Sequence, residues 1–316
     1  MIPTLQSLRF VFVTMIFLSH FSYREIRALD AGGDCGVAFF FLLSGFVCSL
    51  GYGRQLCSGT FRYGTFLRRR FQKLYPLHLL LLLFFLFVSR SAIDGKVLLN
   101  AVLLQSWIPD SAYYFSCNGV SWFLSSLLFC YLAFPLVYRH VSRKLTVAVL
   151  AIYVIVLLLT PYDRVNAVLY VHPMVRFVDF YLGMALYRVY ERQTAEKTFP
   201  DWVEWSLVGL LLVAIAIYPY ADAKLRNAPL YWLVLMPTIL VFARGSGAVS
   251  RLLSTKPMLF LGSLSMPFFL THQMLIGIVQ NHLPTMPAVL MLAVCLCATL
   301  MVSWGIQIIF SRLFRL

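Results

Sequence analysis

Residues 5–23 read LQSLRFVFVTMIFLSHFSY, and this stretch sets the interpretation of the whole chain. It is almost entirely apolar over roughly the 20 residues that a helix needs to cross a bilayer. Nine further stretches have the same character, near residues 36–52, 74–90, 119–138, 145–160, 167–187, 205–220, 229–243, 258–280 and 288–311. We therefore predict an all-α, polytopic integral membrane protein with about ten transmembrane helices.

The overall composition supports the same conclusion. Of the 316 residues, 61% are hydrophobic and only 12% are charged, whereas soluble domains average about 25% charged residues. The net charge of +14 does not indicate nucleic-acid binding, because the basic residues fall in short runs between apolar stretches instead of on one soluble face. We expect the lipid bilayer as a partner and no nucleic acid.

Lys and Arg are concentrated in alternate connections between the apolar stretches. They occur within 53–73, 139–144, 188–197 and 244–256, and again within 312–315. Basic connections favour the cytoplasmic side, so we expect both termini to be cytoplasmic and the protein to lie in the inner (plasma) membrane. The first stretch lacks a small-residue cleavage site and is expected to be a retained helix. With no long linker, residues 1–316 are predicted to form one transmembrane domain.

The longest outer connection is expected at 91–118, with its apolar segment 98–108 lying along the outer surface. Cys35 and Cys117 both fall on the outer side in this topology. A disulfide between them and two free thiols are both compatible with the sequence.

Arg9 and His20 are the first ionisable residues that a membrane span should not tolerate. Such groups are costly in a bilayer and are candidates for function. They are eleven residues apart, which corresponds to about 16 Å of helical rise and to nearly the same helix face. Either both side chains reach toward opposite interfaces, or they line a polar passage with a titratable imidazole at one end.

Two later spans also carry ionisable residues. Arg176 and Asp179 are three apart, a spacing that favours an intrahelical ion pair with a structural role, although a catalytic role stays open. His272 is equally compatible with a hydrogen-bonded core position and with a position that lines a site.

The densest cluster of charge is FLRRRFQKLYPLH at residues 66–78. Arg69, Arg70 and Lys73 would be grouped at a helix start, with Pro76 in the first turn of the following helix. The run is either a topology anchor beside acidic lipid headgroups or a site for a phosphorylated cytoplasmic ligand.

Taken together, these motifs resemble the acyltransferase family 3 membrane proteins along nearly the whole chain. Arg9 and His20 match the family's first-helix pair, and GVAFFFLLSGFVCSLGYG contains an SGF signature at Ser44, Gly45 and Phe46. The basic run, the Trp122 segment NGVSWFLSSLLFCYLAFP, and the later segments RFVDFYLGMAL and LGSLSMPFFLTH follow in the family's order.

Three positions depart from the family pattern. Lys73 replaces the second Arg of the basic motif, which keeps the charge but weakens a bidentate grip on phosphate. Leu127 stands where a Glu is frequent, and Ala38 stands where an Asp is frequent. Mechanisms that need those two carboxylates are therefore in doubt for this chain.

The resemblance implies O-acylation, most simply O-acetylation, of a cell-envelope carbohydrate such as a polysaccharide or lipid-linked glycan. The donor would be cytoplasmic acyl-CoA (acetyl-CoA) bound by Arg69, Arg70 and Lys73, with no permanently bound cofactor and no metal. His20 would act as general base or accept the acyl group transiently, assisted by Arg9 and oriented by Asp30 or Asp34. The residues expected to line the site are Asp34, Ser44, Trp122, Arg176, Asp179 and His272.

Other functions also suit a multi-span protein with buried charge. A transporter or flippase of a lipid-linked glycan would move its substrate without consuming acyl-CoA, but the two halves of the chain show no inverted-repeat similarity. A sensor or scaffold protein would tolerate substitution of His20.

Overall fold

The predicted apolar segments all form helices. The computed structural model describes residues 2–21, 32–90, 92–193, 198–227 and 229–314, and in these residues it contains helices and no strands. Ten helices have 16 or more residues, and each overlaps one predicted span: α1 (Pro3–Phe21), α2 (Gly33–Ser58), α3 (Tyr63–Ser89), α6 (Trp122–Val137), α7 (Arg143–Leu159), α8 (Pro173–Arg192), α9 (Asp201–Ile217), α10 (Pro229–Arg244), α12 (Lys256–His282) and α13 (Ala288–Phe314). The prediction of an all-α polytopic protein is confirmed.

Eight segments of the described chain are individually long and apolar enough to cross a membrane. Helix α7 and the segment up to Val171 would supply a ninth, but the chain bends there by 117° at Pro161. Helix α8 starts only at Pro173, later than predicted, and it carries Arg176 and Asp179 within its first two turns. Because of these charged residues, α8 is not one of the eight apolar segments.

Helix α3 differs most from its predicted bounds. It begins at Tyr63, eleven residues before the expected start at 74, so the basic run lies inside the helix. Pro76 is therefore an interior residue of α3. The sequence had predicted it in the first turn of a helix. A transmembrane helix tolerates such a proline because neighbouring elements can satisfy the backbone group that it frees.

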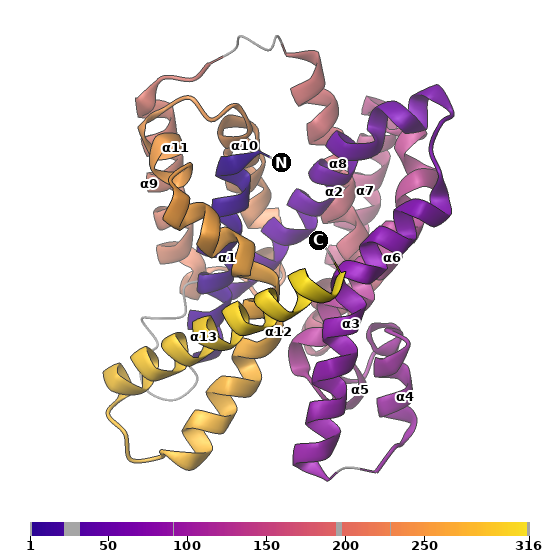
Figure 1. The fold of residues 1–316 in the computed structure, drawn as a ribbon. Helices are drawn as coiled ribbons and strands as arrows, with labels where there is room; N and C mark the ends of the chain where they lie inside the picture. Colours follow the sequence, from indigo (N-terminus) through magenta and orange to yellow (C-terminus); the bar gives the residue numbers. More distant parts are fainter. Residues whose placement is uncertain (1, 22–31, 91, 194–197, 228, 315–316) are drawn as a thin grey trace.

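The helices divide into an inner set and an outer set. In the apolar windows of α1, α2 and α12, 56–67% of residues are buried inside the protein, whereas the values for α3, α9 and α13 are 22%, 22% and 17%. Helix α13 lies obliquely across the outside of the bundle and packs on α12 (Figure 1). The outer helices expose large apolar side chains such as Phe87, Leu212 and Met301. Hydrocarbon can cover such a surface, and eight helices of the described chain are long and apolar enough to cross a membrane, so the chain is an integral membrane protein.

Helices α2 and α8 are in backbone contact at the centre of the bundle. A Cβ atom added at Gly45 would lie 1.9 Å from the carbonyl oxygen of Phe180, and one added at Gly183 would lie 2.0 Å from that of Leu42. Small residues allow transmembrane helices this close approach. The glycines of the SGF and LGMAL segments therefore have a packing role.

The start of helix α1 is hydrogen-bonded to the part of the chain that runs from α10 to α12. The Gln6 amide donates to the carbonyl of Leu259 at 2.9 Å, Ser7 donates to the carbonyl of Leu253, and Thr4 donates to that of Phe242. These bonds fix the rotation of α1 about its own axis. That rotation decides which way Arg9 and His20 face.

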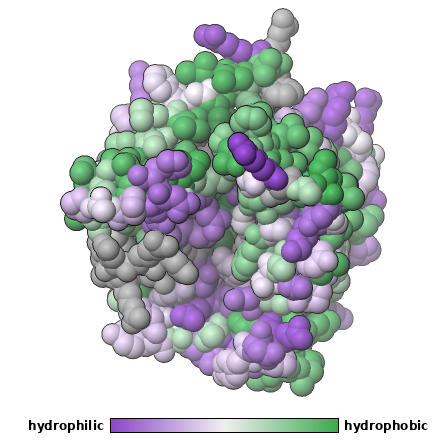
Figure 2. Space-filling model, turned by 90° about the horizontal axis from the view of Figure 1, so that it is seen from below, coloured by the Kyte–Doolittle hydropathy of each residue, from purple (hydrophilic) through white to green (hydrophobic). Residues whose placement is uncertain are grey.

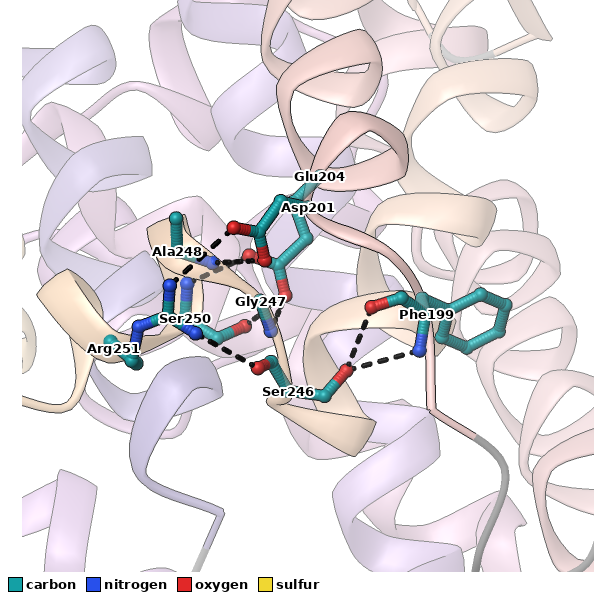
Figure 3. Close-up of polar contacts among 8 residues, drawn as sticks. All are labelled: Phe199, Asp201, Glu204, Ser246, Gly247, Ala248, Ser250 and Arg251. Atoms are coloured by element: carbon teal, nitrogen blue, oxygen red, sulfur yellow. Dashed lines mark hydrogen bonds and ion pairs between the residues drawn. The ribbon is translucent and has the colours of Figure 1, made fainter.

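Buried Glu204 of α9 fixes the short helix α11 (Ala248–Leu253) on the same end of the bundle as the N-terminus (Figures 1 and 3). Its carboxylate accepts hydrogen bonds from the backbone N–H groups of Gly247 and Ser250, at 2.8 and 2.9 Å, and from the Ser250 hydroxyl. A carboxylate is favoured at a helix N-terminus, where unpaired N–H groups converge. Nearby, Arg251 and Asp201 form an exposed ion pair.

At the opposite end, α4 (Gly95–Ala101) and α5 (Ser111–Tyr114) lie beside the end of α3 (Figure 1). Buried Asn100 links them. Its carbonyl accepts from His78 of α3 at 2.9 Å, and its side chain bonds with Ser116 and Ser121. The predicted outer connection is thus an ordered cap over this end of the bundle.

Candidate active site

A cavity of about 140 Å³ opens between α1, α2, α3 and α6 toward the N-terminal end of α1. We call it the inner cavity. Its polar lining consists of Gln6, Arg9, Ser44, Arg70, Lys73 and Tyr131. Three cationic side chains from α1 and α3 therefore face one enclosed space, an arrangement suited to an anionic ligand.

The guanidinium of Arg70 lies among aromatic rings. It is 5.4–5.5 Å from the ring centroids of Tyr52, Phe66 and Tyr131, within cation–π range. Its Nε has no hydrogen-bond partner among the described residues. The aromatic rings hold the side chain in place and leave donor capacity for a ligand.

Arg69 does not join this group. It is exposed and is absent from the lining of the inner cavity. Consecutive helical residues diverge by about 100°, whereas residues three apart share a face. Because α3 already runs through the basic cluster, half-buried Arg70 and exposed Lys73 both line the inner cavity, and Arg69 lies on another face of the helix.

At the other end of α1, His20 pairs with His272 of α12. The His20 Nδ1 atom is 3.0 Å from His272 Nε2 and 3.0 Å from the backbone carbonyl of Ile16. The His272 Nδ1 atom is 2.7 Å from the carbonyl of Phe269, and His272 is fully buried. The two imidazole rings, 252 residues apart in the sequence, are thus in hydrogen-bond contact.

These contacts favour one tautomer of each ring. A carbonyl oxygen only accepts, so both Nδ1 atoms carry hydrogen. The single His20 Nδ1–H is then shared between two acceptors, the Ile16 carbonyl and His272 Nε2. In neutral His20 the remaining lone pair is on Nε2, which is the nitrogen that a general base or a nucleophile needs.

His20 lines a second, larger cavity of about 610 Å³, the outer cavity. Its aromatic lining comprises Phe84, Phe85, Phe115, Trp122 and Tyr170, and its polar lining includes Ser89, Asn118, Gln273 and Asn281. These residues come from α1, α3, α6 and α12, from the connections beside α5, and from the segment Asn166–Val171 before α8. Figure 2 shows this end of the molecule, where hydrophilic residues are interspersed among hydrophobic ones.

The two cavities do not form one polar passage. Phe40 and Phe123 line the inner cavity, and both rings pack against Phe269, with centroids 6.3 and 5.1 Å apart. Phe269 in turn packs on the His272 ring at 5.9 Å. Arg9 and His20 thus face cavities within the protein on the same helix, and an aromatic partition of three phenylalanines separates those cavities. The two cavities have no lining residue in common, so these rings interrupt the polar passage that the sequence left open as one alternative.

Arg176 and Asp179 form a buried ion pair at 2.8 Å in α8. Arg176 also donates to the backbone carbonyls of Tyr170 and Asn227, and Asp179 accepts from the indole N–H of Trp232 at 2.6 Å. Neither residue lines the inner or the outer cavity. The pair acts on the site indirectly, because it anchors the backbone of Tyr170 in the wall of the outer cavity.

The other expected residues are distributed as follows. Ser44 lines the inner cavity and Trp122 the outer one, where its ring packs on Tyr170 at 4.8 Å. Asp34 accepts a hydrogen bond from the Tyr218 hydroxyl at 3.1 Å, and Asp30 lies outside the described residues. Among the residues that the structure describes, the side chain that orients His20 is the imidazole of His272.

Cys35 and Cys117 are both free thiols, so the disulfide that the sequence permitted is not formed. Within the described residues, no group of His, Cys, Asp or Glu side chains is arranged to hold a metal ion.

Sequence reasoning overlooked the neutral polar residues of the site. Gln6 and Tyr131 line the inner cavity, and Asn118, Tyr170 and Gln273 line the outer one. A neutral amide or phenol costs less than a charge in an apolar helix, so it is a weaker indication of function. Two of them could have been predicted from their neighbours in the sequence. Asn118 begins the Trp122 segment, and Gln273 directly follows His272.

Fold and site together define a helical membrane protein in which one helix, α1, contributes Arg9 to a cationic cavity and His20 to an imidazole pair with α12. A family model described as an acyltransferase domain matches residues 2–308. The chain therefore belongs to acyltransferase family 3.

Two curated relatives are similar over part of the chain. Acyltransferase MdmB of Streptomyces mycarofaciens is 35% identical over 162 residues, which cover 45% of this chain and 40% of that protein. Protein 2 in picA locus of Rhizobium radiobacter is 41% identical over 71 residues, covering 22% of this chain and 37% of that protein. The matched part thus spans about two fifths of the length of each relative. No solved structure gives a significant match.

Proposed function

We propose that this protein is a membrane O-acyltransferase. It moves an acyl group, most simply acetyl, from cytoplasmic acyl-CoA to a hydroxyl of an extracytoplasmic glycan or glycolipid of the cell envelope. The observation that carries the proposal is that α1 contributes Arg9 to a cationic cavity and His20 to an imidazole pair with His272 of α12, in a chain of the acyltransferase family.

The inner cavity suits the donor. Acyl-CoA combines phosphate groups with a long, thin pantetheine arm. Arg70 and Lys73 would contact phosphates at the cavity mouth, and Arg9 lies deeper along α1, where it can stabilise charge on the thioester oxygen. Lys73 provides a point charge where the family has Arg, so Arg70 provides the bidentate contact.

The aromatic partition must open during the reaction. His20 lies about 16 Å along α1 from Arg9, beyond Phe40, Phe123 and Phe269. Rotation of these rings admits the thioester to the imidazole pair. In the closed arrangement, the rings keep water of the outer cavity away from the thioester.

His20 Nε2 carries out the chemistry. It removes the proton from the acceptor hydroxyl, whose oxygen bonds to the thioester carbonyl carbon. The carbon–sulfur bond then breaks, and the CoA thiolate takes up the proton from the imidazolium. An acyl-imidazole route would use the same lone pair on Nε2. In both routes His272 is a positioning residue that holds the His20 N–H in place.

The role of His272 can be tested with two variants. Gln places an acceptor oxygen near the position of His272 Nε2, whereas Leu removes the acceptor. We expect His272→Gln to retain several-fold more acyl transfer than His272→Leu at equal expression and equal thermal stability. Equal activities in the two variants would show that His272 only fills space.

The function itself is tested by mass spectrometry of envelope glycans from cells with and without the gene. The proposal predicts an acyl mass that is lost on deletion, restored by the wild-type gene and not restored by His20→Ala. A transporter or flippase would instead change the amount or location of the glycan and leave its acylation per molecule unchanged.

A further inference from the structure

A shallow furrow of about 400 Å³ lies on the outer side of α3, near the end of the bundle that holds the N-terminus. We call it the α3 furrow, and it is lined by Leu67, Arg68, Phe71, Gln72, Tyr75 and Pro76. Helix α3 stands on the outside of the bundle beside α6 (Figure 1), and in its apolar window only 22% of the residues are buried inside the protein. In an integral membrane protein, the outer side of such a helix faces lipid.

A narrow gap of about 20 Å³ lies between the α3 furrow and the inner cavity. The gap shares three lining residues with the furrow. It shares three others with the inner cavity, namely Arg70, Leu74 and Tyr131. Side chains of α3 and α6, and no intervening helix, therefore separate the inner cavity from the outer side of α3.

The floor of the furrow is made of side chains that other contacts hold in place. The rings of Phe71 and Tyr75 pack at 4.4 Å, and the Tyr75 hydroxyl donates to the carbonyl of Ala101 at 2.7 Å. Arg68 lies three residues before Phe71, so the two side chains project from the same face of α3. The furrow thus combines a fixed aromatic surface with a cationic group beside it.

The positive charge at this place is not balanced by the protein. Arg68 and the neighbouring Arg69 are exposed, and the ion pairs among the described residues all involve other side chains. Residues 53–73 contain no Asp or Glu. A basic residue near the membrane surface attracts anionic lipid headgroups, whereas an apolar furrow accepts a hydrocarbon chain. The two features together suit one molecule that has both parts.

We infer that the α3 furrow binds one anionic glycerophospholipid of the leaflet at the N-terminal end of the bundle, which is the cytoplasmic leaflet in the predicted topology. The lipid phosphate contacts Arg68, and one hydrocarbon chain lies on Phe71 and Tyr75. The bound chain covers the gap from outside and so completes the side wall of the inner cavity. This inference goes beyond the proposed function, because lipid binding requires no acyl transfer.

The test is native mass spectrometry of the full chain, delipidated in detergent and titrated separately with dioleoyl phosphatidylglycerol and dioleoyl phosphatidylcholine. The two probes have the same hydrocarbon chains, and only the first has a net negative charge. We expect the first molecule of phosphatidylglycerol to bind about fivefold more tightly than the first molecule of phosphatidylcholine. Arg68→Gln should remove most of this preference, since one basic residue near the membrane surface contributes about that factor.

Arg143→Gln is the matched control for charge. Arg143 is exposed at the start of α7 and lines neither the furrow nor the gap, so this variant should keep the preference. Phe71→Ala tests the furrow itself and should weaken the binding of both lipids severalfold, because it removes apolar surface from under the chain. Phe87→Ala is its control, since Phe87 is exposed on the same helix and lies outside the furrow. It should bind both lipids as the wild type does.

The inference is overturned if phosphatidylglycerol binds no more tightly than phosphatidylcholine, if Arg68→Gln retains the full preference, or if Arg143→Gln loses as much of it. Phe71→Ala that binds both lipids as tightly as the wild type would overturn it as well. None of these measurements depends on acyl transfer. A protein that transfers no acyl group can therefore still support the lipid site, and a failed lipid site leaves the acyltransferase proposal standing.

Discussion

Replacing Gly45 by alanine should force α2 and α8 apart. The new Cβ would lie 1.9 Å from the carbonyl oxygen of Phe180, whereas an ordinary contact needs at least 3.4 Å, so the helices must separate locally by about 1.5 Å. Overpacking of this kind costs typically about 1–3 kcal/mol, and backbone cannot yield as a side chain does. At about 2–4 °C per kcal/mol, Tm should fall by roughly 2–12 °C.

Gly51→Ala is the control on the same helix. A Cβ at Gly51 meets nothing within 4 Å, and alanine is the better helix former by about 1 kcal/mol. The measurement is thermal unfolding of purified protein, followed by intrinsic tryptophan fluorescence. Gly45→Ala should fall below the wild type, while Gly51→Ala should match or exceed it.

Gly183→Ala tests the same interface from the other helix, because its Cβ would lie 2.0 Å from the Leu42 carbonyl. Once one alanine has separated the helices, the second should add little, so the double variant should lose less than the sum of the single losses. A wild-type Tm for Gly45→Ala, or an equal fall for Gly51→Ala, would refute the reasoning.

Three further outcomes are expected. Arg70→Ala should raise the apparent KM for acetyl-CoA about tenfold by removing a charge-assisted contact, whereas exposed Arg69→Ala should not; equal effects in steady-state assays would favour the topology-anchor interpretation. Glu204→Gln should lower the free energy of unfolding by about 1–3 kcal/mol, because a buried carboxylate with three donors loses an acceptor; an unchanged denaturation midpoint would contradict this. Phe40→Ala should widen the partition and raise turnover of butyryl-CoA relative to acetyl-CoA; an unchanged ratio would place the acyl chain elsewhere.

Much of the fold is predictable from hydropathy alone, because a span in lipid must be an apolar helix. Helical periodicity, which needs only the local sequence, also predicts that Arg9 and His20 lie on one face of α1. Both side chains do face cavities inside the protein. The start of α3 was missed because its first turns are basic, and hydropathy records the lipid-facing part of a helix and not its full length.

The partner of His20 could not be predicted because it depends on packing. His272 is 252 residues away in the sequence, and only the packing of α1 against α12 brings its Nε2 atom to 3.0 Å from His20 Nδ1. A carboxylate at Asp30 or Asp34 was the natural expectation for orienting an imidazole. Likewise, the partition by Phe40, Phe123 and Phe269 arises from three helices and has no local pattern.

The central claim is that His20 carries out acyl transfer with a donor held at the other end of α1. The most direct measurement is release of free CoA from acetyl-CoA by purified protein in nanodiscs with an envelope glycan extract as acceptor. The account predicts that His20→Ala loses at least about 100-fold in rate, as expected for a lost general base, while it binds acetyl-CoA as tightly as the wild type. Full activity of His20→Ala would contradict the account.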